Sequence, residues 1–239
     1  NELKDKAYKI EKEAFKFENA LKTDDIAFIC EIKKASPSKG IIAQDFPFKD
    51  IALEYEKAGA NAVSVLTEPD FFLGSNEYLK KISQIINIPI LRKDFIIDEI
   101  QIYESKIIGA DAILLICSIL DEETLKDFIT IADSLGLSCL VETHNEEEIQ
   151  KAIKAKARII GVNNRNLKDF SVDIKNSINL RKFVPSNIIF VSESGIKEHL
   201  QIKELKQNSV NAVLIGETFM KSQNKELELS ILKGEVNEN

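Results

Sequence analysis

Eight short apolar runs, each followed by a segment with helical periodicity, constrain the fold of this 239-residue chain more than any other feature. Runs that are apolar nearly throughout are typical of parallel strands covered on both faces. Eight such units without linker composition predict an α/β fold, a (β/α)8 TIM barrel forming one domain over residues 1–239. An open doubly wound sheet is the alternative, but it rarely needs eight evenly spaced units. The predicted strands are residues 26–32, 62–66, 88–92, 112–117, 138–142, 159–163, 188–193 and 212–216.

The segments between these runs carry the apolar spacing and the boundary residues of helices. Leu125, Phe128, Ile129, Ala132 and Leu135 form one apolar stripe along a helix. Residues 1–22 predict an extra N-terminal helix that either covers the bottom of the barrel or lies over its active face. Residues with capping chemistry stand at the expected boundaries: Ser75, Asp121, Asn145 and Ser171 as N-caps, and Gly59, Gly109 and Gly136 at helix ends.

Composition and charge exclude several classes of function. The net charge is −7 and only four of the 32 basic residues are Arg, whereas nucleic-acid-binding domains are basic. The longest apolar run, 112–117, is far shorter than the roughly 20 residues of a membrane helix. The chain starts NELKDKAYKI, without the apolar stretch of a signal peptide. Cys30, Cys117 and Cys139 lie far apart in apolar runs, which is typical of buried thiols in a reducing compartment. We expect a cytoplasmic protein without nucleic-acid or membrane partners.

Ionisable residues collect at the C-terminal ends of the predicted strands and are nearly absent within them. A barrel places its chemistry at that end, in the loops that lead from strand to helix. Because the polar residues follow most of the strands in the same direction, we expect them to share one site. They are Glu31 and Lys33, Lys93 between Arg92 and Asp94, Glu142 with His144 nearby, Asn163 and Arg165, Glu193, and Glu217.

Two pairs of residues after the last two strands favour phosphate binding. Ser194-Gly195 follows the seventh strand and Gly216-Glu217 follows the eighth. Barrels often bind phosphate in these two loops, on backbone N–H groups beside a short helix. Glycine lets the backbone approach the oxygens closely. We therefore expect a phosphorylated small-molecule substrate.

Lys33 and Lys93 are the candidate cations for a substrate carboxylate or carbonyl. In a partly dry pocket beside another cation the ammonium form of a lysine is disfavoured, so we expect a lowered pKa and a better proton donor. Glu31 and Glu142 supply counter-charges and a possible base. His and Cys show no metal-ligand spacing, so we expect no metal. Four apolar residues near this rim are either core lids or a ligand platform: Phe71, Phe72, Phe95 and Leu114.

Seven segments at these strand ends together resemble the indole-3-glycerol phosphate synthase family. They are EIKKASPSKG (31–40), SVLTEPDFF (64–72), LRKDF (91–95), VETH (141–144), VNNRNL (162–167), SESGI (192–196) and LIGETFM (214–220). The resemblance runs in order over about residues 15–233 and implies the indole-forming step of tryptophan biosynthesis. In that step 1-(2-carboxyphenylamino)-1-deoxyribulose 5-phosphate closes a ring and loses carbon dioxide and water. No metal or organic cofactor is implied.

The resemblance also implies a role for each site residue. Lys93 is the general acid at the carbonyl, Glu142 the acid and base of the dehydration, and Lys33 the ligand of the leaving carboxylate or a second proton donor. Glu31 and Asn163 position hydroxyl and ammonium groups, with Glu193 nearby. The remaining roles are binding ones: Ser194, Gly195, Gly216 and Glu217 hold phosphate; Phe72, Phe95, Leu114, Leu167 and Pro37 enclose the anthranilate ring; Arg165 and Ser36 complete the rim. Glu217 stands where many family members have serine.

Two other functions compete with this one. Another phosphate-binding barrel enzyme, such as phosphoribosylanthranilate isomerase, would keep the phosphate loops but need a Cys/Asp acid–base pair. Cys30 directly precedes Glu31 and so points to the opposite face of its strand, which opposes that alternative. A non-catalytic phosphate-binding barrel would bind the ligand without turnover. We expect a monomer or a weak homodimer.

Overall fold

Eight parallel strands close into a barrel in the computed structural model, which describes residues 2–166 and 169–236. Strand β1 (Ala27–Ile32) pairs with β4 (Ala62–Leu66) on one side and with β10 (Ala212–Ile215) on the other, which closes the sheet. Between them lie β5 (Ile90–Lys93), β6 (Ala112–Ile116), β7 (Ser138–Thr143), β8 (Ile159–Asn163) and β9 (Ile189–Glu193). The predicted TIM barrel is confirmed, and every predicted strand end lies within two residues of the observed one.

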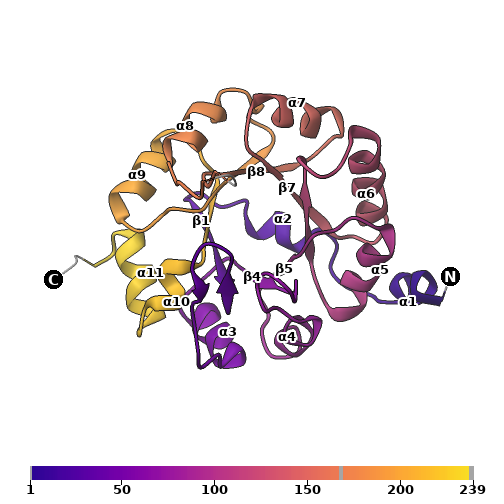
Figure 1. Ribbon diagram of the computed structural model, residues 1–239, viewed down its shortest axis with the longest axis horizontal. Coiled ribbons are helices and arrows are strands. Elements are labelled where there is room, and N and C mark those ends of the chain that lie inside the picture. Colours follow the sequence, from indigo (N-terminus) through magenta and orange to yellow (C-terminus); the bar gives the residue numbers. More distant parts are fainter. Residues whose placement is uncertain (1, 167–168, 237–239) are drawn as a thin grey trace.

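The helices surround the barrel as an outer ring (Figure 1). Three predicted N-caps are confirmed, because Ser75, Asp121 and Asn145 each accept a backbone N–H of the helix that follows. Gly59, Gly109 and Gly136 all have positive φ after helices, as expected. The ring contains α3 (Phe48–Lys57), α4 (Asn76–Ile82), α5 (Glu99–Ile108), α6 (Glu122–Ser134), α7 (Glu146–Lys154), α8 (Lys175–Arg181), α9 (His199–Gln207), α10 (Glu217–Lys221) and α11 (Lys225–Lys233).

The prediction that Ser171 caps a helix was wrong. Its hydroxyl and N–H both bond to the side chain of Asp169, which holds it in a loop. Helix α8 begins only at Lys175, whose N–H is accepted by the carboxylate of Asp173. Ser171 therefore lies too far before the helix to cap it, and its hydroxyl takes part in a local Asp–Ser contact instead.

The N-terminal extension forms two short helices, α1 (Glu2–Tyr8) and α2 (Lys16–Ala20), instead of one. Residues 9–15 separate the two helices, and Phe15, directly before α2, has a left-handed backbone and donates its N–H to Gly136 O at 2.9 Å. Phe17 and Leu21 are buried with the inward residues of the barrel. Of the two positions left open by the sequence, this segment takes the bottom of the barrel, and α2 is seen inside the helix ring in Figure 1.

A small hairpin that the sequence did not predict follows β1. Strands β2 (Ala35–Ser36) and β3 (Gly40–Ile41) pair antiparallel at the two ends of the SPSKG motif. Gly40 has φ of +65°, which only glycine adopts freely, and so permits the tight turn. The hairpin places Ser36 and Pro37 beside the C-terminal ends of the barrel strands.

Side chains alternate between the barrel interior and the layer beneath the helices. In β1, Ala27 and Ile29 belong to the interior core, whereas Phe28 and Cys30 belong to the core between strands and helices. The same alternation directs Glu31 inward. All three cysteines are free and buried, as predicted. Among the described residues, no helix is both long enough and apolar enough to cross a membrane.

The contribution of the N-terminal extension can be measured with a matched pair of substitutions. Leu21 is 2% exposed beneath the barrel, whereas Leu200 on α9 is 70% exposed. We expect Leu21→Ala to lower the free energy of unfolding by about 2–5 kcal/mol, through lost transfer energy and a residual cavity. Leu200→Ala should change it by less than about 0.5 kcal/mol. Urea denaturation measures both, and equal losses would contradict the packing described for α2.

Candidate active site

One cavity of about 930 Å³ opens at the C-terminal end of the barrel and is lined from the ends of all eight barrel strands. Every predicted site residue that the structure describes lines this cavity, and Leu167 lies outside the described residues. The predicted residues in the lining are Glu31, Lys33, Ser36, Pro37, Phe72, Lys93, Phe95, Leu114, Glu142, Asn163, Arg165, Glu193, Ser194, Gly195, Gly216 and Glu217.

Two lysines and three glutamates form the charged floor of the cavity. The Lys93 Nζ lies 2.5 Å from Glu193 Oε2 and 3.5 Å from Glu142 Oε2. Lys33 forms an ion pair with Glu31, two residues earlier on the same face of the chain. Residues distant in sequence therefore meet because the closed barrel brings the ends of β1, β5, β7 and β9 together.

The expectation of a lowered pKa for Lys93 was wrong. Burial does lower the pKa of Lys93, but the carboxylates of Glu193, Glu142 and Glu31 outweigh burial and hold it above its ordinary value. A lowered pKa would need a neighbouring cation, whereas the folded site surrounds the Lys93 ammonium with anions. Burial raises the pKa of Glu31, yet Lys33 and Lys93 hold it below its ordinary value. At neutral pH, Lys93 is therefore protonated and Glu31 ionised.

Glu193 has the most perturbed carboxyl group of the site. Burial raises its pKa to about 7, against the opposing effect of Lys93. One oxygen, Oε1, is buried and has no hydrogen-bond partner among the described residues. A Cβ at Gly161 on the neighbouring strand would lie 2.1 Å from this oxygen, so glycine there leaves room for the carboxyl group. Glu193 can exchange a proton near neutral pH and has an oxygen free for a ligand.

His144 connects Glu142 to a residue that the sequence analysis missed. The imidazole Nδ1 lies 3.1 Å from Glu148 Oε2, and Nε2 lies 3.6 Å from Glu142 Oε1. The hydrogen bond with Glu148 is the largest of the effects that raise the pKa of His144. The spacing of four residues between His144 and Glu148 was the available signal, because a residue just before a helix can contact its first turn.

Aromatic side chains form one wall of the cavity. The ring of Phe95 lies 6.4 Å from those of Phe71 and Phe72. Phe71 is 61% and Phe95 38% exposed, so they are a wall open to solvent rather than core lids. The buried carboxylate of Glu68, which the sequence analysis overlooked, accepts the N–H groups of Asp70, Phe71 and Phe72 at 2.7–3.0 Å.

The loops after β9 and β10 meet on another side of the cavity. Ser194 and Gly195 both have positive φ, at +70° and +87°. Gly216 directly precedes α10, and a Cβ there would lie 2.5 Å from Glu31 Oε1, so a larger residue would displace the Glu31 carboxylate. The carboxylate of Glu217 is held by Lys221 at 2.6 Å. Gly195 and Gly216 therefore stand where a side chain would collide with Val172 or with Glu31.

Cys30 lies away from the cavity, in the core between strands and helices. Burial raises the pKa of its thiol, which makes it a poor acid or base near neutral pH. Cys30 therefore cannot supply the Cys/Asp pair of the competing isomerase. Within residues 2–166 and 169–236, no group of three or more His, Cys, Asp or Glu is placed to hold a metal ion.

A closed (β/α)8 barrel with a charged cavity at the C-terminal ends of its strands defines a barrel enzyme. The sequence model of indole-3-glycerol phosphate synthase matches residues 1–232. The indole-3-glycerol phosphate synthase of Ruminiclostridium cellulolyticum is 60% identical over 225 residues, covering 94% of this chain and 86% of the relative. That of Endomicrobium trichonymphae is 64% identical over 208 residues, covering 87% and 81%. The chain belongs to the indole-3-glycerol phosphate synthase family, decarboxylating lyases of tryptophan biosynthesis.

Solved structures with much lower identity share the fold. A 3-hexulose-6-phosphate synthase superposes with a TM-score of 0.70 at 12% identity, over 88% of this chain and 100% of the other. The structure of KGPDC from Streptococcus mutans gives a TM-score of 0.68 at 11% identity, over 89% and 97%. These similarities support the barrel architecture alone.

The contact between His144 and Glu148 predicts a titration that NMR can follow. We expect the imidazole of His144 to titrate above the ordinary pKa of about 6.5. Glu148→Gln should move the midpoint down, because it removes the largest cause of the shift. The stability from this pair is fully present below about pH 6.5 and is lost as the pH rises through the folded-state midpoint. Since His199 is the only other histidine, the spectrum of His199→Gln identifies the His144 signals. An unchanged His144 midpoint in Glu148→Gln would show that Glu148 does not raise this pKa.

Proposed function

We propose that this chain converts 1-(2-carboxyphenylamino)-1-deoxyribulose 5-phosphate to indole-3-glycerol phosphate. The observation that carries the proposal is the ammonium group of Lys93, held between Glu142 and Glu193 in the cavity that Lys33 also lines. The family to which the chain belongs supports the choice of reaction. The arrangement offers a protonated acid, carboxylates and a second cation within one enclosed site.

Ring closure is the step that most needs an acid. The aromatic carbon that bears the carboxylate is a poor nucleophile, so the sugar carbonyl must be protonated as the carbon–carbon bond forms. In this proposal Lys93 gives that proton, and Glu142 and Glu193 keep its ammonium in place. Loss of carbon dioxide then restores aromaticity and leaves a hydroxyl group on the new ring.

Dehydration completes the reaction. The hydroxyl leaves as water when it is protonated and a proton is removed from the new ring. We assign this acid and base work to Glu142, which can remove the ring proton and pass a proton to the leaving hydroxyl. Lys33 binds the leaving carboxylate or donates the proton to the hydroxyl, and Glu31, Asn163 and Glu193 position the hydroxyl and ammonium groups. Lys93 and Lys33 thus act in different steps of the reaction, and substitution of one lysine at a time can distinguish their roles.

Binding at both ends of the substrate would hold the reacting carbons together. We assign the phosphate to the backbone of the loops after β9 and β10, and the anthranilate ring to the aromatic wall. Holding two groups in a reactive geometry contributes a large part of the rate of such a reaction. The phosphate residues are Ser194, Gly195, Gly216 and Glu217; the ring residues are Pro37, Phe72, Phe95, Leu114 and Leu167; Ser36 and Arg165 complete the rim.

We also propose that the chain acts in the cytoplasm as one domain, either as a monomer or as a weak homodimer. The three buried free thiols suit a reducing compartment.

Turnover tests the proposal directly. Incubation with the carboxyphenylamino-deoxyribulose phosphate should give a rise in indole fluorescence, which a chain without Trp makes easy to follow. Lys93→Met should lower kcat on the order of 10²- to 10⁴-fold, as expected for loss of a general acid. Lys49→Met, at an exposed position on α3, is the control and should keep full activity. Binding without turnover by the unsubstituted protein would favour the non-catalytic barrel instead.

The phosphate assignment can be tested with the dephosphorylated substrate. Hydrogen bonds to charged groups contribute about 1.5–3 kcal/mol each, so losing even one should lower kcat/KM by about 10-fold or more. Inorganic phosphate should inhibit the reaction in competition with substrate. Equal kcat/KM values for the two substrates would contradict a phosphate site in these loops.

A further inference from the structure

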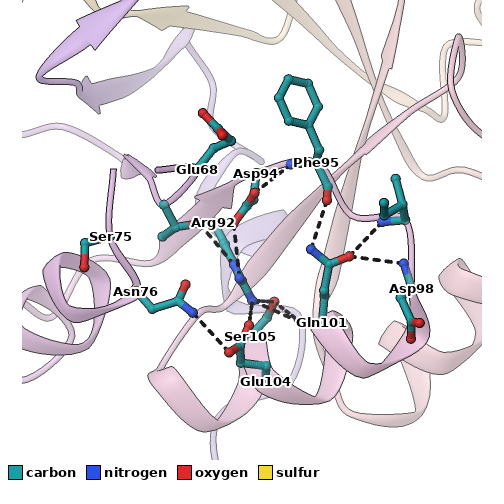
Figure 2. Close-up of polar contacts among 12 residues, drawn as sticks. Glu68, Ser75, Asn76, Arg92, Asp94, Phe95, Asp98, Gln101, Glu104 and Ser105 are labelled. Carbon is teal, nitrogen blue, oxygen red and sulfur yellow. Dashed lines mark hydrogen bonds and ion pairs between the residues drawn. The ribbon is translucent and has the colours of Figure 1, made fainter. Parts of the chain in front are cut away.

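A buried arginine lies directly behind Lys93, on the helix-facing side of the barrel wall. Arg92 is 3% exposed, and its guanidinium contacts two carboxylates, Asp94 at 3.1 Å and Glu104 at 2.8 Å. Figure 2 shows the side chain directed from β5 toward Glu104 and Ser105 of α5. The charge is thus paired on both sides, as burial of a guanidinium requires.

The remaining donors of Arg92 connect three elements. Nε donates to Thr67 Oγ1 after β4 at 3.1 Å, and Nη1 donates to Gln101 O and Ser105 Oγ of α5, each at 3.1 Å. The Asn76 amide of α4 donates to Glu104 at 3.1 Å and extends the network. One side chain therefore joins the ends of two neighbouring barrel strands to the helix outside them.

This network encloses the backbone on both sides of Lys93. The N–H of Thr67 donates to Lys93 O at 3.1 Å, and the Thr67 hydroxyl donates to Asp94 Oδ2 at 2.6 Å. Asp94 in turn accepts the N–H of Phe95 at 2.8 Å, and Gln101 donates to Phe95 O at 3.0 Å (Figure 2). The residues before and after Lys93 are therefore held from the outer side of the wall, and Lys93 itself is held by the backbone bond from Thr67.

We propose that Arg92 is a positioning residue for the reaction: by joining β4, β5 and α5 it sets the place of the Lys93 ammonium and of the Phe95 ring. The inference rests on the proposed function, in which Lys93 is the acid and Phe95 bounds the ring pocket. Arg92 itself faces away from the cavity and touches no substrate. It acts through the backbone that carries these two side chains.

Lysine cannot replace arginine in this place. A guanidinium offers five N–H donors in a planar fork, whereas an ammonium offers three donors at one point. Arg92 uses its donors on Thr67, Gln101, Ser105, Asp94 and Glu104, which lie on different sides of the group. Arg92→Lys preserves the buried charge and removes the cross-link, so it separates positioning from simple charge balance.

The test compares Arg92→Lys with a matched variant at the opposite end of the barrel. Arg158 also pairs with two carboxylates, Asp133 at 2.8 Å and Glu18 at 2.7 Å, and lies below the barrel beside α2. Arg158→Lys therefore makes the same chemical change away from the cavity. The measurements are kcat and KM from indole fluorescence, and the thermal midpoint of each variant.

We expect Arg92→Lys to lower kcat on the order of 10- to 100-fold with KM within about threefold, since small misplacements of reacting groups have effects of this size. Arg158→Lys should keep both constants. If Arg92→Lys does not fold, Glu104→Gln at the solvent edge of the network takes its place. It should also lower kcat while leaving KM nearly unchanged, but by a smaller factor than Arg92→Lys. The inference is overturned if Arg92→Lys, or Glu104→Gln where Arg92→Lys does not fold, keeps kcat within twofold, or if Arg158→Lys loses as much activity. Absence of turnover in the unsubstituted protein would overturn the proposed function instead.

Discussion

Mutual pairing of buried charges is the constraint on which the rest of this site depends. Taking an isolated ammonium or carboxylate out of water costs several kcal/mol, so such groups persist in a protein interior only with partners. Lys93 has Glu142 and Glu193 within 3.5 Å, and Lys33 has Glu31. Partners from separate strands can meet this requirement only if the sheet closes, which makes closure of the barrel and assembly of the site one event.

Side chains along each strand point alternately into the barrel and toward the helices, so the barrel wall has two faces with different functions. In β5, Lys93 points into the cavity, and Arg92 points to the helices and is held by Thr67 and Glu104. In β1, Glu31 lies inside and Cys30 outside. Chemistry on the inner face therefore depends on polar packing on the outer face, where the residues touch no ligand.

The sequence predicted the strands well because burial on both faces leaves a local signal, a run of apolar residues. It also predicted which polar residues meet, because all of them follow strands in the same direction. It failed where distant contacts decide. Phe15, the residue before α2, bonds to Gly136, far along the chain, and the N-terminal segment forms two helices instead of one. The raised pKa of Lys93 depends on three carboxylates from other strands, whose number and distance no local pattern contains.

An anionic substrate and a chain of net charge −7 are compatible once the local arrangement is considered. Net charge acts over long distances through screened solvent, whereas a cleft responds to the groups that line it. Lys33, Lys93 and Arg165 line the cavity, and the first two are held by carboxylates. A substrate carboxylate then has paired cations to contact, and burial raises the pKa of Glu193 to about 7. Near neutral pH, Glu193 therefore carries less negative charge than an ordinary glutamate, so the burial that perturbs its pKa also lowers the repulsion that the cavity exerts on an anion.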